Sequence, residues 1–256
     1  MSFCGKACQK VAWPGHKKEC RRVQREKARV LDKAGADFAA DEAMAADYCR
    51  ADIPKGAECY ICLNQTSYGQ LRGDLVRGCS CRGPHAGFVH IRCLVKNAEE
   101  RGEHDDEAYD EALRTCTQCR QDFRGPVAVA LWRASWLRFA GRAETDHVRQ
   151  MALYNLGAVL ANMDRLDEAL VINEEHLAAM RRLYEPDDFR TILAEEGVAR
   201  TLRSLGGEEN ARSAVEMLTR VYGHKLRRCG RNHEQTLNTA SSLANALQLT
   251  GKFDEA

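Results

Sequence analysis

Apolar residues recur at helical spacing over most of the chain, which predicts a mainly α-helical protein. Strong helix formers fill residues 22–50, so we expect a single linking helix there. Pro54 and Gly56 follow and end the helical pattern. The apolar positions of this helix include Val23, Val30, Leu31 and Phe38.

The last part of the chain contains three similar segments, "LGAVLANMDRLDEA" at 156–169, "VARTLRSLGGEENA" at 198–211 and "LANALQLTGKFDEA" at 243–256. Their ends lie 42 and 45 residues apart, which predicts a solenoid of helix-turn-helix repeats over residues 147–256. In the middle copy Glu208 replaces an apolar residue, so we expect that repeat to be degenerate. The matching positions are Gly157, Ala199 and Ala244, then Leu160, Leu202 and Leu247, then Ala169, Ala211 and Ala256.

Residues 125–146 include the apolar stretch "VAVALWRASWLRFAG". Its large side chains, Leu131, Trp132, Trp136 and Phe139, lie on an amphipathic stretch. We therefore expect a connecting helix here that packs against the repeats that follow it.

Composition and charge narrow the functions. A chain of 256 residues with 44% hydrophobic content can bury one large core or several small ones, which favours a modular protein. Its formal net charge of +1 provides no overall field for nucleic acid, so we expect no nucleic-acid partner. No apolar run approaches the roughly 20 residues that span a bilayer, and no signal peptide is recognisable. We expect a soluble cytoplasmic protein, and a nuclear location stays open.

Four closely spaced pairs of cysteine and histidine lie between residues 59 and 119. In a reducing compartment, 12 cysteines favour zinc over disulfides. Zinc prefers four sulfur or nitrogen ligands in a tetrahedron, so eight ligands suit two closed structural sites. A segment this small depends on its metal for folding. The pairs are Cys59 and Cys62, Cys79 and Cys81, His90 and Cys93, and Cys116 and Cys119.

The order of these ligands and the motif "FVHIRCL" resemble a RING-CH (RING-variant) zinc finger over residues 55–124. In that family the first and third pairs bind one zinc ion, and the second and fourth pairs bind the other. The resemblance therefore implies that His90 is a ligand and that His85 is not. It implies one site of Cys59, Cys62, His90 and Cys93, and a second of Cys79, Cys81, Cys116 and Cys119.

The chain departs from the RING-CH pattern at one spacing, because eight residues separate Cys81 from His90 where the family usually has seven. The PHD finger, which reads methylated histone tails, has the same ligand order and is the competing resemblance. It normally has a shorter gap before its histidine, and an aromatic residue where this chain has Arg114.

The RING-CH resemblance implies an E3 ubiquitin ligase, which holds a ubiquitin-charged conjugating enzyme in a reactive conformation and needs no nucleophile of its own. It implies that Ile61 contacts the conjugating enzyme and that Arg120 contacts both enzyme and ubiquitin. The alternatives are that Ile61 only packs beside the zinc loop and that Arg120 is only exposed to solvent, without contacting a partner. Membrane-bound members of the family commonly carry tryptophan at the position of Asn97. The absence of that aromatic side chain would weaken the apolar part of the docking groove.

The N-terminal sequence "CGKACQKVAWPGHKKEC" resembles the second half of a MYND finger over residues 1–21. That family uses eight ligands, and the first four would precede Met1. We therefore expect either a fragment of a longer chain or a makeshift single site for one further zinc ion. The third alternative is a cysteine-bearing amphipathic helix. The candidate ligands are Cys4, Cys8, His16 and Cys20.

The C-terminal repeats resemble tetratricopeptide repeats, and "GRNHEQTLNTASSLANAL" points to the longer kinesin-light-chain type. This resemblance implies a concave surface that binds a peptide or protein client. The chain stops inside the second helix of the third repeat, so we expect both termini to cut through domains.

These observations predict a mainly α protein in which a small zinc-stabilised RING-CH domain precedes an α-helical repeat solenoid. The leading hypothesis is a ubiquitin ligase whose partners are a conjugating enzyme and ubiquitin, with substrate recruited by the repeats. The alternative is a non-enzymatic adaptor for protein–protein interaction. A hydrolase or transferase with an active site of its own is disfavoured, because no nucleophile and base are spaced to act together and both groups of zinc ligands are closed.

Overall fold

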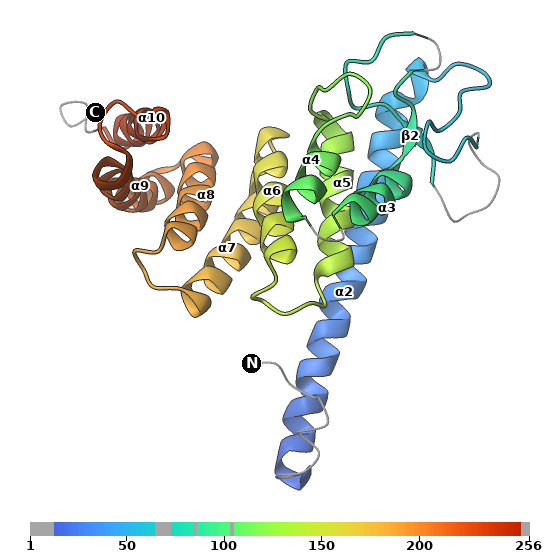
Figure 1. The fold of residues 1–256 in the computed structure, drawn as a ribbon. Helices are drawn as coiled ribbons and strands as arrows, with labels where there is room; N and C mark the ends of the chain where they lie inside the picture. The colour runs from blue at the N-terminus through green and yellow to red at the C-terminus, as the bar shows by residue number, and fades with distance from the viewer. Residues whose placement is uncertain (1–12, 65–72, 84–85, 103–104, 252–256) are drawn as a thin grey trace. The chain divides into compact units, whose positions relative to one another are not determined.

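The chain forms two compact units, Met1–Arg149 and Gln150–Ala256. It is mainly α-helical, which confirms the fold class predicted from the periodicity of its apolar residues (Figure 1). The computed structural model describes residues 13–64, 73–83, 86–102 and 105–251.

The first unit contains a long helix, α2 (Trp13–Cys49), which covers the segment where a linking helix is expected. Its later half buries one face, and this part of the unit packs against α5 (Gly125–Phe139). A short 3-10 helix, η1 (Arg50–Asp52), follows it and ends just before Pro54. The buried residues of α2 recur every three or four positions and include Ala34, Phe38, Asp41, Ala45 and Cys49.

Helix α5 packs against α2, α3 (Ile91–Arg101) and α4 (Asp106–Arg114) within the first unit. Helix α5 is thus the central helix of the first unit, and its contact with the repeats stays a prediction. Its apolar residues surround the helix instead of forming one stripe, so nearly every side is buried. The helix also ends at Phe139, earlier than the expected connecting segment.

A two-stranded antiparallel sheet joins the irregular part of the first unit to α3. Strand β1 (Leu75–Val76) pairs with β2 (Val89–His90), with Leu75 opposite His90. All four residues are buried. Because β2 leads directly into α3, His90 stands at the start of that helix and is held in place by both elements.

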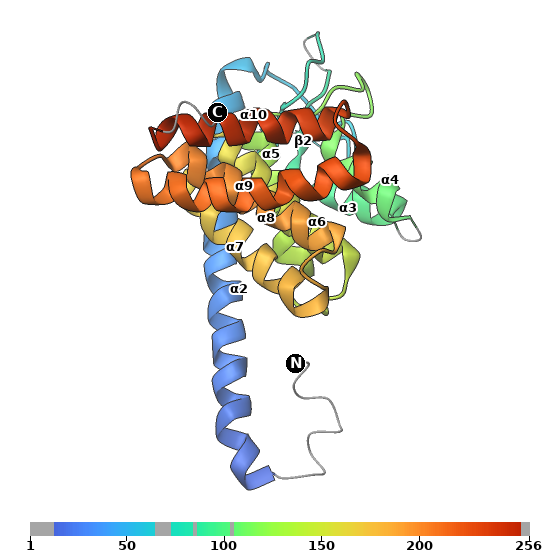
Figure 2. The same cartoon turned by 90° about the vertical axis from the view of Figure 1, so that its left-hand side faces the viewer.

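The second unit is a series of antiparallel helices that pack in chain order, which is the arrangement of a repeat solenoid (Figure 2). Contacts join α7 to α8, α8 to α9 and α9 to α10. The helices are α6 (His147–Asn162), α7 (Leu166–Leu183), α8 (Phe189–Leu205), α9 (Glu208–Cys229) and α10 (Glu234–Leu249).

Most of the positions shared by the three sequence copies lie in the core of this unit, whereas Ala244 is half-buried. Leu160, Leu202 and Leu247 are buried, and so are Ala169 and Ala211. Ala256 lies outside the described residues.

The middle copy differs because Glu208 stands in the exposed first turn of α9, where a negative charge is favourable near the helix N-terminus.

Among the described residues, no helix combines the length and the apolar character needed to cross a membrane.

Candidate metal centre

Eight cysteine and histidine side chains of the first unit gather into two groups of four. Within each group, one ligand atom from every residue lies within 4.8 Å of the others. The groups combine alternate pairs along the chain, as the resemblance implies. Cluster one contains Cys59, Cys62, His90 and Cys93, and cluster two contains Cys79, Cys81, Cys116 and Cys119.

One pair of each cluster lies in a tight turn, and the two turns have the same backbone structure. The amide of Leu63 donates to the carbonyl of Cys59 over 2.8 Å, and the amide of Arg120 donates to the carbonyl of Cys116 over 2.9 Å. Leu63 and Arg120 also share positive φ angles of 57° and 58°. We call these turns the first knuckle (59–63) and the second knuckle (116–120).

The amide of each leading cysteine is also bonded, to the carbonyl of Asn64 in the first knuckle (3.0 Å) and of Gln121 in the second (2.9 Å). Each knuckle is therefore closed from both sides, and its two thiols are directed toward the same point. The local sequence thus positions two of the four ligands of a metal site, and the other two ligands come from a distant part of the chain.

In cluster one, that second half is placed by β2 and α3. His90 is almost fully buried, and its Nδ1 atom lies 3.5 Å from the sulfur of Cys62 and 3.6 Å from that of Cys93. His90 and Cys93 are one helical turn apart, so their side chains point the same way. The arrangement identifies Nδ1 as the ring atom directed at the thiols.

Cluster two is supported by Gly87 and Gln118. The side-chain oxygen of Gln118 accepts from the amide of Gly87 over 2.9 Å and lies 3.7 Å from the sulfur of Cys81. Gly87 has a φ of +79°, and a Cβ there would lie 2.7 Å from the Cβ of Cys81. It would also lie 3.1 Å from the sulfur atoms of Cys79 and Cys81, so only glycine fits.

The thiols of each cluster are close enough to shift one another's pKa. The hydrogen bond between Cys79 and Cys116 raises the pKa of Cys79 and lowers the pKa of Cys116 to about 5. Burial raises the pKa of Cys81 to about 11 and that of Cys93 to about 12. A group of neighbouring thiolates requires a cation, which stabilises the deprotonated forms together.

The donor sets fit zinc. One cluster offers three thiols and an imidazole nitrogen, and the other offers four thiols; both ligand sets are typical of structural zinc sites. Four protein ligands complete a tetrahedron, so neither cluster leaves a position for a reacting water. This chemistry supports folding and does not support metal-assisted hydrolysis.

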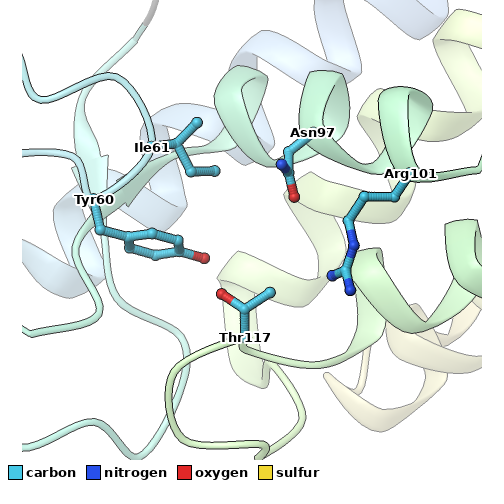
Figure 3. Close-up of a pocket in the computed structure, with 5 residues that line it drawn as sticks. All are labelled: Tyr60, Ile61, Asn97, Arg101 and Thr117. Carbon is cyan, nitrogen blue, oxygen red and sulfur yellow. The ribbon is translucent and has the colours of Figure 1, made fainter.

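A pocket of about 370 Å³ lies beside the knuckles and α3 (Figure 3). Tyr60 and Thr117 line it, and each directly follows the leading cysteine of its knuckle. Ile61 also lines the pocket, as does Asn97 of α3. Arg101, at the end of α3, completes the lining.

The two residues that the RING-CH resemblance assigns to docking are placed differently. Ile61 lines the pocket, whereas Arg120 does not. Arg120 lies 3.5 Å from a carboxylate oxygen of Glu111, and both side chains are exposed. Tyr60, Arg101 and Thr117 were not expected from the sequence. The available signal was the position of Tyr60 and Thr117 immediately after a leading cysteine.

The candidate N-terminal ligands are not positioned by the structure. Cys4 and Cys8 lie outside the described residues, and so does His85 in the first unit. His16 and Cys20 belong to α2, but their side chains are outside the described part of the chain.

Family models match two separate parts of the chain. The MYND finger model matches residues 1–20, and a tetratricopeptide repeat model matches residues 149–224. No curated protein matches the chain.

Two solved structures of Podosopora anserina putative kinesin light chain TPR-like repeats, one of them of a substituted variant, are similar at 17% identity. Their TM-scores are 0.43 and 0.42; each alignment covers 64% of this chain, and 69% and 68% of the respective structures.

These findings confirm the MYND-like sequence at the N-terminus and the tetratricopeptide character of the second unit. A MYND finger is a zinc-binding module, and the two clusters have the ligand chemistry of zinc sites. Together, a zinc finger and helical repeats support a role in protein–protein interaction.

Proposed function

We propose that residues 55–124 form a RING-CH-type finger with two zinc ions and act as an E3 ubiquitin ligase module. In this proposal the finger holds a ubiquitin-charged conjugating enzyme, and the repeats from residue 147 onward recruit the substrate. The observation that carries the proposal is the alternation of ligand pairs between cluster one and cluster two. This cross-connection would hold the two knuckles and the start of α3 together as one rigid surface.

Catalysis would consist of positioning. Ile61 projects from the first knuckle beside a pocket that extends to α3, so a docked enzyme would contact both elements (Figure 3). Arg120 at the end of the second knuckle is exposed, and its pair with Glu111 is weak enough to be exchanged for another partner. No residue of the finger acts as a nucleophile or base. The rate gain would come from restricting the orientation of the thioester.

The repeats offer a separate pocket for a client. It has a volume of about 250 Å³ and lies between α6, α7 and α8. Tyr154, Asn173 and Arg200 are among its lining residues, so it presents aromatic, amide and cationic groups together. This mixture suits a peptide that contributes both apolar and polar side chains.

The zinc content tests the structural half of the proposal. We expect native mass spectrometry of the full chain to find two zinc ions, and a third if Cys4, Cys8, His16 and Cys20 form a further site. Cys59→Ser and Cys79→Ser should each lose zinc, whereas Cys229→Ser should keep it, because Cys229 belongs to neither cluster. A chain that binds no zinc would contradict the proposal.

Self-ubiquitination tests the ligase half. The full chain, Ile61→Ala and Cys59→Ser would be compared with a broad set of ubiquitin-charged conjugating enzymes. We expect activity in the wild type, a strong reduction for Ile61→Ala and loss for Cys59→Ser. A zinc-loaded wild type that is as inactive as Cys59→Ser with every enzyme would contradict ligase function.

The second candidate is a non-enzymatic adaptor in which zinc modules and repeats only bind proteins. Asn97 favours it, because this residue places an amide where a docking groove would use a large apolar side chain. The self-ubiquitination experiment separates the two, since an adaptor would stay zinc-loaded and inactive.

A further inference from the structure

The pocket beside the knuckles is lined mainly by polar side chains that can donate hydrogen bonds. Tyr60 and Thr117 supply hydroxyl groups, Asn97 supplies an amide and Arg101 supplies a guanidinium. In Figure 3 these groups point into the same space, with Ile61 forming an apolar wall. No carboxylate lines the pocket among the described residues.

These donors are not used within the described parts of the chain. The hydroxyl of Tyr60 is buried, and no hydrogen bond of normal geometry reaches it, although Thr117 stands nearby. Asn97 and Arg101 make no hydrogen bond or ion pair among these residues. Of these lining groups, only the Tyr60 hydroxyl is a buried donor without a partner, which is unfavourable, whereas Arg101 and Thr117 are exposed to solvent. An acceptor that enters the pocket would relieve the cost at Tyr60 and could also bind Arg101.

Several described carboxylates near Arg101 have partners of their own, and Glu99, two residues before it, accepts from Arg138 of α5. Glu100 lies 3.7 Å from the amine of Lys96, and Glu111 lies 3.5 Å from Arg120. Asp105 caps α4 by accepting from the amides of Glu107 and Ala108. None of these groups pairs with Arg101, so within the described part of the chain its guanidinium lines the pocket without a carboxylate partner.

We propose that this pocket receives the carboxylate of an aspartate or glutamate side chain on the protein that docks against the knuckles. Arg101 is the specificity-determining residue, because a guanidinium binds a carboxylate through two parallel hydrogen bonds. Ile61 contacts the methylene groups of that side chain, and a lysine or arginine in its place would be repelled. The inference rests on the proposed function only for the identity of the docking protein.

An NMR titration tests the carboxylate chemistry directly. Acetate and its neutral analogue acetamide would be added to the zinc-loaded full chain at constant ionic strength. We expect acetate to produce saturable shifts at the Arg101 side-chain NH and the Thr117 amide, and acetamide to produce none. Arg101→Gln should abolish the acetate effect, whereas Arg114→Gln should retain it, because Arg114 is paired with Asp110 away from the pocket.

Two outcomes of this titration would overturn the inference. One is an equal response to acetate and acetamide, which would show that charge is not recognised. The other is an acetate response that survives in Arg101→Gln, or that appears only at arginines outside the pocket. Unchanged backbone shifts in Arg101→Gln would confirm that the variant is folded.

Ubiquitin discharge from conjugating enzymes tests the docking protein as the source of the carboxylate. For an enzyme that the wild type activates, Arg101→Gln should raise KM about tenfold and leave kcat nearly unchanged, as expected for one lost charged hydrogen-bond pair. Arg114→Gln should match the wild type. An unchanged KM for Arg101→Gln would contradict the inference. A wild type that discharges no enzyme but binds acetate would contradict the ligase proposal and leave the carboxylate site supported.

Discussion

Arg133 of α5 donates from Nε to a carboxylate oxygen of Asp41 on α2 over 2.7 Å, and both residues are almost fully buried. The two residues are 92 positions apart, so this ion pair fixes how the long helix lies against the central helix of the first unit. A second carboxylate, that of Asp37, lies 3.9 Å from the guanidinium.

Asp41→Ala should therefore destabilise the first unit by about 3 to 5 kcal/mol, because it removes the carboxylate that lies closest to a buried guanidinium. Urea unfolding followed by tryptophan fluorescence would measure this, since Trp132 and Trp136 are buried on α5. The matched control is Asp47→Ala on the same helix, whose pair with Arg50 is exposed and should contribute less than about 1 kcal/mol. Equal effects of the two substitutions would show that the buried pair does not fix the helix.

Gly87→Ala should weaken metal binding in cluster two, because the new methyl group would press against Cys79 and Cys81. We expect zinc affinity to fall at least about tenfold in a chelator competition. Gly56→Ala is the control, since Gly56 has a similar φ of +82° but no heavy atom within 4 Å of the added carbon. It should cost about 1 kcal/mol of backbone strain while zinc affinity stays unchanged. If both variants released zinc equally, crowding at Gly87 would not be the cause.

Gly157→Ala should destabilise the second unit, because its Cβ would lie 2.0 Å from the side-chain oxygen of Asn173. Asn173 is buried and donates to the hydroxyl of Thr201 over 3.0 Å, so it cannot move away freely. We expect a loss of about 1 to 3 kcal/mol in urea unfolding followed by circular dichroism.

Gly223→Ala in the interior of α9 is the control for Gly157→Ala. Its added carbon would be 3.5 Å from the end of the flexible Arg227 side chain, which is ordinary contact. This variant should be neutral or stabilising by up to about 1 kcal/mol, since alanine is the better helix former. A Gly157→Ala variant that behaves like Gly223→Ala would contradict the packing shown at Asn173.

His176 should make the second unit less stable in acid. Burial lowers its pKa from 6.5 to about 4. Between these two pH values His176 is therefore mostly neutral in the folded state and mostly protonated in the unfolded state. Stability is then complete above about pH 6.5 and falls as the pH drops toward 4, by about 3 kcal/mol in all. Hydrogen exchange of the α7 amides, corrected for intrinsic rates, would follow this change.

His176→Gln should remove most of this pH dependence, because glutamine does not titrate. The Tyr154 ring, 6.1 Å from the His176 ring, would keep a neighbour of similar size. If the α7 amides of this variant lost hydrogen-exchange protection as steeply as those of the wild type between pH 6.5 and 4, the loss of stability in acid would be due to groups other than His176.

Periodicity was sufficient to predict the helical class, the repeats and the helix now called α2. It was not sufficient to predict that Arg133 of α5 is buried, because in the sequence this residue looks like an ordinary exposed polar position. Its burial becomes understandable only from the contact with Asp41 of α2. A buried charge is recognisable only through its partner, and no local pattern connects residues so far apart in sequence.

The spacing of cysteines predicted four pairs of ligands, but it could not decide how they combine. Every pair looks locally like half a site, and the combination depends on the path of the chain between them. The resemblance to RING-CH fingers supplied the combination, and the structure gathers the same residues. The pocket could not be predicted in this way, because Tyr60 and Thr117 belong to different knuckles and line one pocket only in three dimensions.

The alternation of the ligand pairs has a consequence for a nicked chain. Cleavage of one peptide bond between Cys81 and His90 would leave one pair of each cluster on either fragment. With zinc in both clusters, the fragments would stay associated through two metal bridges, and a chelator would weaken that association. The folded structure of this segment would thus depend on bound metal more than on an unbroken backbone.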